Sequence, residues 1–61
     1  MTLTGKQLVK ILEDDGWKLD RIAGSHHIMA KGSKKISVPV HSGQAIPTGL
    51  LNKLLKQAGL K

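Results

Sequence analysis

Two amphipathic segments, one near each end of the chain, most constrain its fold. Thr4 and Gln7 have the spacing of a capping box at the start of a helix. The apolar residues that follow recur at helical spacing and are Leu8, Val9, Ile11 and Leu12. A second helix opens at Pro47-Thr48-Gly49, and its apolar stripe is Leu50, Leu51, Leu54, Leu55 and Ala58. Both segments end in a glycine and an apolar residue, a pattern typical of helix C-termini, so each predicts a helix with one apolar face.

Three extended segments lie between these helices. They are residues 17–22, 26–31 and 36–40, separated by a turn at Gly24-Ser25 and by a polar loop over residues 31–35. Short connections favour an antiparallel meander. The two apolar helix faces should cover one side of it and leave the other side open. The expected class is therefore α+β, in the order helix, three strands, helix.

Alternation assigns side chains to the two faces of these strands. In the first strand it groups Trp17, Leu19 and Arg21 on one face, and it puts Lys18, Asp20 and Ile22 on the other. In the third strand Ile36, Val38 and Val40 should point to the core. Pro39 cannot donate to a ladder, which indicates an edge strand. Trp17, the only aromatic residue, is expected in the core and not on a base-stacking surface.

The length allows only a single domain, over residues 1–61. The absence of cysteine excludes disulfides and thiolate metal sites. No stretch approaches the roughly 18 apolar residues that span a bilayer. The N-terminus also lacks the layout of a signal peptide. We therefore expect a soluble, cytoplasmic protein that does not bind membranes.

The charge is strongly basic, with ten Lys and Arg against four Asp and Glu, a formal net charge of +6. Such a field favours a polyanionic partner such as nucleic acid, although many small basic proteins are merely cationic. Three of the four acids form the run Glu13-Asp14-Asp15 at the C-terminal end of the first helix, where the helix dipole disfavours them. A partner surface is one possible reason for that run.

Two of the three histidines are adjacent, in Gly24-Ser25-His26-His27. Strand alternation turns His26 and His27 to opposite faces, so they should not share one site. A metal site is not favoured, because the pair cannot easily reach one ion and no carboxylate cluster supports it. His41 is isolated. For each histidine, a surface residue without special chemistry is the ordinary alternative.

In these motifs the chain resembles the HicA family, the small toxins of HicA–HicB toxin–antitoxin systems. The resemblance runs in order through the whole chain and rests on Asp15-Gly16-Trp17, Gly24-Ser25-His26-His27, Val38-Pro39 with His41, and Ile46-Pro47-Thr48-Gly49-Leu50 with the final helix. It implies a double-stranded-RNA-binding-domain-like fold. It also implies a metal-independent endoribonuclease that cleaves mRNA and needs no cofactor. A HicB-type antitoxin would cover the active site, and the free toxin would be a monomer that enters larger assemblies through the antitoxin.

The same resemblance implies His26 as the catalytic residue, with His27 as the runner-up. A metal-free ribonuclease needs one group that takes the proton from a ribose 2′-hydroxyl and another that protonates the leaving oxygen. Histidine suits both roles because its reference pKa is about 6.5, so His26 is expected to act as general base or acid. Gly24 and Ser25 would shape the backbone beside the RNA. The candidate phosphate-binding cations are Arg21, Lys31, Lys34 and Lys35, although the lysines of the 31–35 loop are also consistent with a solvated turn.

Two other functions fit the composition. One is a non-catalytic double-stranded-RNA-binding module of the same fold. Such modules grip phosphates with lysines at a helix N-terminus, and Thr48-Gly49-Leu50-Leu51 has none. The other is a small interaction protein whose basic face meets an acidic partner. Charge and fold fit the ribonuclease and the RNA-binding module equally, and only the histidine motif separates those two.

Overall fold

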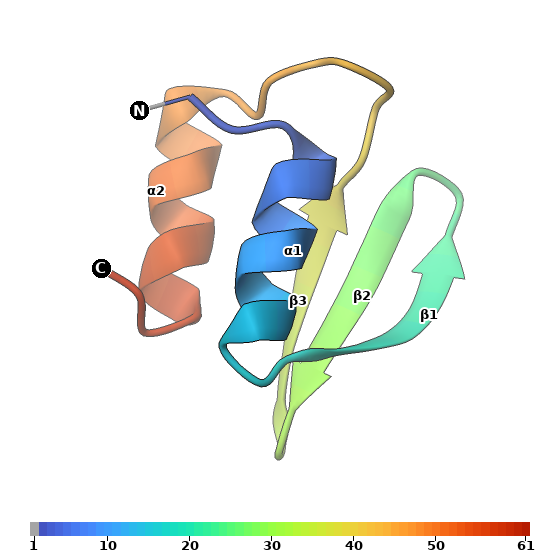
Figure 1. Cartoon of the computed structure of the whole chain (residues 1–61), viewed down its shortest axis with the longest axis vertical. Coiled ribbons are helices and arrows are strands. Elements are labelled where there is room, and N and C mark those ends of the chain that lie inside the picture. The colour runs from blue at the N-terminus through green and yellow to red at the C-terminus, as the bar shows by residue number, and fades with distance from the viewer. Residues whose placement is uncertain (1) are drawn as a thin grey trace.

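The computed structural model describes residues 2–61, and its elements follow the expected order (Figure 1). They are α1 (Gly5–Asp14), β1 (Lys18–Ala23), β2 (His26–Lys31), β3 (Lys34–Pro39) and α2 (Thr48–Gln57). The strands form one antiparallel sheet in the order β1-β2-β3. The α+β class and the meander are confirmed. The limits of β1 and β3 differ from the prediction by one or two residues.

The start of α1 and the C-terminal ends of both helices have the capping contacts that their sequences predict. At the start of α1, the Thr4 hydroxyl accepts from the Gln7 N–H at 3.2 Å, and the Gln7 side-chain oxygen accepts from the Thr4 N–H at 2.9 Å. At its end, Gly16 has a φ of +97° and the Trp17 N–H donates to the Leu12 carbonyl at 2.9 Å. The same closing bond joins Leu60 to Leu55 after α2, also at 2.9 Å. Each apolar residue after the glycine thus turns back over its helix.

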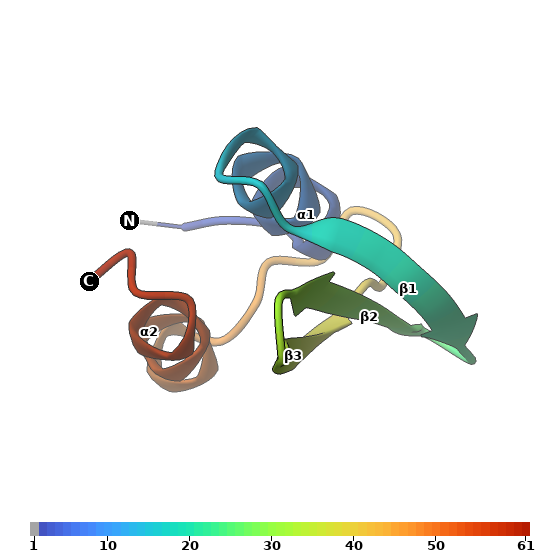
Figure 2. The ribbon, with the colours of Figure 1, turned by 90° about the horizontal axis from the view of Figure 1, so that it is seen from below.

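The core lies between the helices and one face of the sheet. Its buried apolar residues are Leu8, Leu12, Trp17, Met29, Ile36, Val38, Ile46, Leu51, Leu54 and Leu55. α1 packs over the sheet, while α2 lies at its β3 edge (Figures 1 and 2). Trp17 is only 2% exposed, which confirms it as a core residue. Within residues 2–61 no helix combines the length and apolarity needed to traverse a membrane.

Gly5 fixes how α1 meets the sheet. A Cβ atom at this position would collide with the carbonyl oxygen of Pro39 and would lie 2.8 Å from the Cα of Val40. The first residue of α1 is therefore in backbone contact with the end of β3. Because backbone atoms cannot move aside as a flexible side chain can, this close approach requires glycine.

A β-bulge in β1 changes which of its side chains share a face. Leu19 pairs with Met29, but the next pair is Arg21 with Ile28, so Asp20 is the extra residue. Leu19 and Ile22 consequently lie on the helix side of the sheet, and Arg21 lies on the open side. The predicted alternation, which grouped Leu19 with Arg21 and opposed them to Ile22, is wrong because it assumed a regular strand.

Candidate functional site

The open face of the sheet brings together three polar side chains from three strands. On β2 this face carries His26 and Ile28, since the next residue, Met29, points into the core. Arg21 of β1 and Ser37 of β3 lie opposite Ile28 on its two sides. His26 is therefore a diagonal neighbour of both, within reach of long side chains. Arg21, His26 and Ser37 are all exposed, and we call this group the open-face site.

One hydrogen bond orients His26 in this site. Its Nδ1 lies 3.1 Å from the Ser37 hydroxyl oxygen, while the residue directly opposite it on β3 is Pro39. The bond engages one ring nitrogen and leaves Nε2 for a ligand. Sequence reasoning had not singled out Ser37. The signal was present, because Ile36 and Val38 alternate toward the core and so turn Ser37 to the face of His26.

The backbone before His26 is a tight turn held to the end of β3. Gly24 has a φ of +60°, a left-handed conformation that favours glycine. The Ser25 carbonyl accepts from the Val40 N–H at 2.7 Å, which ties this turn to the segment leading into His41. Gly24 and Ser25 thus set the path of the chain into His26, and nothing lies within 4 Å of a Cβ placed on Gly24.

His27 lies on the other side of the sheet, as alternation predicts. Its cross-strand neighbours are Val38, a core residue, and Ile22. The ring is partly buried, and its Nδ1 is buried without a hydrogen-bond partner among residues 2–61. His26 and His27 therefore have separate surroundings, one polar and exposed and the other largely apolar.

The three candidate lysines lie toward the opposite end of the strands from His26. Lys35 is on the open face, where its Nζ is 3.4 Å from the Asp20 carboxylate. Lys31 and Lys34 form the last pair of β2 and β3, beside the connecting turn. The structure thus places Arg21 on the face of His26, as its diagonal neighbour, and sets Lys35 apart from them along that face. Lys31 and Lys34 are two residues from Met29 and Ile36, so they point to the helix side of the sheet.

Two lysines pair with the acidic run at the end of α1. Lys31 Nζ donates to the Asp15 carbonyl at 2.8 Å and to the Asp15 carboxylate at 3.2 Å. Lys10 pairs with Asp14 at 3.6 Å. Cations from β2 and from α1 itself therefore compensate charges that the helix dipole disfavours. These cations account for two of the three acids, since Glu13 has no ion pair among residues 2–61.

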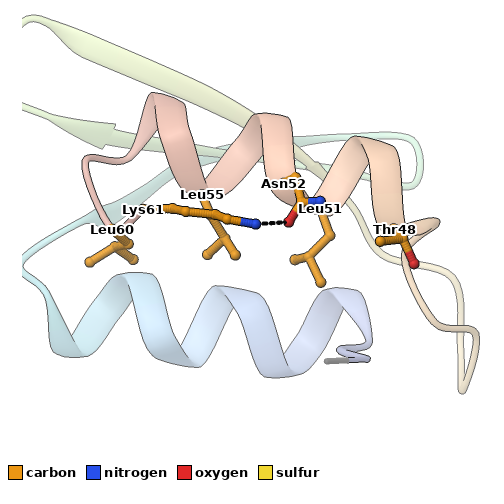
Figure 3. Close-up of a pocket in the computed structure, with 6 residues that line it drawn as sticks. All are labelled: Thr48, Leu51, Asn52, Leu55, Leu60 and Lys61. Atoms are coloured by element: carbon orange, nitrogen blue, oxygen red, sulfur yellow. Dashed lines mark hydrogen bonds between the residues drawn. The ribbon is translucent and has the colours of Figure 1, made fainter.

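No other assembled site competes with the open face in the part of the chain that the structure describes. A groove beside α2, facing α1, is lined by Thr48, Leu51, Asn52, Leu55, Leu60 and Lys61 (Figure 3). It contains none of the predicted site residues. Among residues 2–61, no three His, Asp or Glu side chains are grouped closely enough to hold a metal ion.

Comparison with known proteins adds one finding. The model of a family described as the HicA toxin of bacterial toxin–antitoxin matches residues 5–60. A search of curated proteins gives no match. The matched range contains both helices, all three strands and the whole open-face site.

Proposed function

The chain belongs to the HicA toxin family of bacterial toxin–antitoxin systems, and on this premise we propose that it is a metal-independent endoribonuclease that cleaves mRNA. The observation that carries the proposal is the open-face site. His26 is exposed there, one of its ring nitrogens is held by Ser37, and Arg21 is its diagonal neighbour. A general base and a guanidinium on one accessible face supply two of the groups that phosphodiester cleavage by a ribose hydroxyl uses.

In this mechanism His26 is the general base. Its Nε2 takes the proton from a ribose 2′-hydroxyl, and the 2′-oxygen attacks the adjacent phosphorus. The bond from the 2′-oxygen to phosphorus forms as the bond from phosphorus to the 5′-oxygen breaks, and the 5′-oxygen takes a proton from solvent. The imidazolium then returns its proton to solvent. The products are a 2′,3′-cyclic phosphate and a 5′-hydroxyl.

Arg21 would neutralise the charge that develops on the phosphate in the transition state. Its guanidinium makes no ion pair with any residue in 2–61, so it is available to a ligand. Lys35 on the same face would bind a phosphate further along the strand of RNA. Lys31 and Lys34 point to the helix side of the sheet, so they would reach RNA only around the far turn. Gly24 and Ser25 would let the RNA backbone approach closely beside His26.

The proposal includes an antitoxin of the HicB type that covers the open-face site. A chain of net charge +6 with Arg21 beside its reactive histidine calls for a more acidic covering surface. The free toxin would be a cytoplasmic monomer, and larger assemblies would form through the antitoxin.

Growth arrest on expression tests the proposal. Wild-type protein should arrest growth, and His26→Ala at the same soluble level should not. His27→Ala is the matched control, because His27 is adjacent in sequence but faces the other side of the sheet, and it should still arrest growth. Arrest by His26→Ala would contradict the assignment. RNA binding without cleavage by the wild type would instead favour a non-catalytic RNA-binding module on the same face.

A further inference from the structure

We propose that Ser37 is a positioning residue that holds His26 in the tautomer required of a general base. The inference rests on the proposed ribonuclease function and adds a residue to it. It starts from the 3.1 Å contact between His26 Nδ1 and Ser37 Oγ. Ser37 Oγ is the only hydrogen-bond partner of the His26 ring within residues 2–61.

The residues paired with His26 and the next residue on its face cannot form hydrogen bonds to its ring through their side chains. Across the two strand pairs His26 faces Ala23 and Pro39, neither of which has a polar side-chain atom. The next residue on its own face of β2 is Ile28, also apolar. An exposed histidine with only these neighbours would be free to rotate and to exchange tautomers. Arg21 is the other polar diagonal neighbour and makes no hydrogen bond to the ring, so among residues 2–61 the Ser37 hydroxyl is the group that restrains it.

The direction of the hydrogen bond decides which tautomer is held. When Nδ1–H donates to Ser37 Oγ, Nε2 carries the lone pair and can accept the proton of a 2′-hydroxyl. After proton transfer both ring nitrogens are donors, and Oγ still accepts from Nδ1–H. In the opposite direction the hydroxyl would donate to Nδ1. That hydrogen bond would be lost when Nδ1 is protonated, and Nε2 would already carry a proton and could not accept another. In the proposed role the hydroxyl serves the base, and its protonated form, as an acceptor.

Strand geometry makes the restraint firm. Ser37 is a short side chain in the middle of β3, and it lies diagonally across from His26 in a register set by six consecutive pairs. Its hydroxyl needs only one torsion to be fixed, so little side-chain entropy opposes the bond. Threonine and valine both suit this position in a strand. They have nearly the same volume, and threonine has a hydroxyl where valine has a methyl group.

Ser37→Val and Ser37→Thr form a matched pair for the test. Nitrogen chemical shifts of the His26 ring in the free protein report its tautomer without RNA. We expect the Nδ1–H form in wild type and Ser37→Thr. In Ser37→Val the ring should revert to the Nε2–H form that imidazole favours in water. In RNA cleavage, Ser37→Val should lower kcat by about 10-fold, part of what a general base supplies, with little change in KM.

The outcomes separate this inference from the proposed function. Full cleavage by Ser37→Val, or an Nε2–H ring in the wild type, would overturn the role of Ser37 while leaving His26 as the base. Equal losses in Ser37→Val and Ser37→Thr would show that shape and not the hydroxyl matters, which also overturns it. A wild type that does not cleave RNA would remove the ribonuclease proposal and the role of Ser37 with it. Circular dichroism of each variant verifies that the fold is intact.

Discussion

Arg21 of β1 lies directly opposite Ile28 of β2, and this pairing exists because Asp20 is bulged out of the ladder. Without the bulge, alternation from Leu19 would turn Arg21 toward the helices, away from His26. Bulges often redirect a side chain beside an active site. In this chain the bulge places Arg21 on the same face as the predicted catalytic histidine.

Replacing Arg21 by glutamine should weaken RNA binding and leave stability unchanged. Measured in a His26→Ala background, which prevents cleavage, Arg21→Gln should reduce the slope of log K against log salt by about 0.7, the loss of one phosphate contact on a single strand. Lys53→Gln on α2 is the control, since it removes the same charge from an exposed residue outside the open-face site. An equal reduction of the slope in both variants would mean that RNA binding depends only on net charge.

Replacing His27 by leucine should stabilise the fold and preserve RNA cleavage. The His27 Nδ1 is buried without a partner, and removing an unpaired buried polar atom recovers a cost of about 1 kcal/mol. Urea unfolding followed by the fluorescence of the buried Trp17 would measure the change in the free energy of unfolding. A clear loss of stability, or a loss of cleavage comparable to that of His26→Ala, would contradict the separation of the two histidines.

Two glycines at the starts of the helices should respond to alanine in opposite ways. At Gly5 a Cβ collides with the Pro39 carbonyl, so Gly5→Ala should destabilise the protein by more than about 1 kcal/mol despite the better helix propensity of alanine. At Gly49 a Cβ has no atom within 4 Å, and Gly49→Ala should stabilise by roughly 0.5–1 kcal/mol. Thermal unfolding of both variants measures these effects. The same sign of change in both would contradict the close contact of α1 with β3.

Removing the charge of Lys31 should weaken the end of α1. Lys31→Gln loses the contacts to the Asp15 carbonyl and carboxylate, and we expect the free energy of unfolding to fall by about 0.5–1 kcal/mol at low salt. High salt should reduce the difference in the free energy of unfolding between Lys31→Gln and the wild type. Lys34→Gln is the control, because Lys34 has no ion pair among residues 2–61. The RNA contact predicted for Lys31 stays a prediction, and the affinities of the same two variants test it.

The sequence predicted the helices, the strand order and the core because these features depend on local patterns. The Thr4–Gln7 capping box and the two glycine endings specify the helix limits through bonds made within a few residues. The adjacent positions of His26 and His27 were enough to assign them to opposite faces. The buried Trp17 followed from its place behind Gly16.

The sequence missed features that depend on contacts between distant residues. Asp20 gives no local signal of a bulge, so the face of Arg21 could not be assigned. The contact between Lys31 and Asp15 joins two residues 16 positions apart, and local patterns therefore give no sign of it. The bond between His26 and Ser37 depends on the register of β2 against β3, which alternation alone does not specify.

Cleavage of a defined single-stranded RNA by purified protein tests the central claim most directly. The assay contains a chelator, compares wild type with His26→Ala, and identifies the ends of the products. The account predicts cleavage by the wild type with cyclic phosphate ends, resistance of RNA with a 2′-deoxy sugar at the cleaved position, and a rate at least about 100-fold lower for His26→Ala. Cleavage by His26→Ala at the wild-type rate would contradict it.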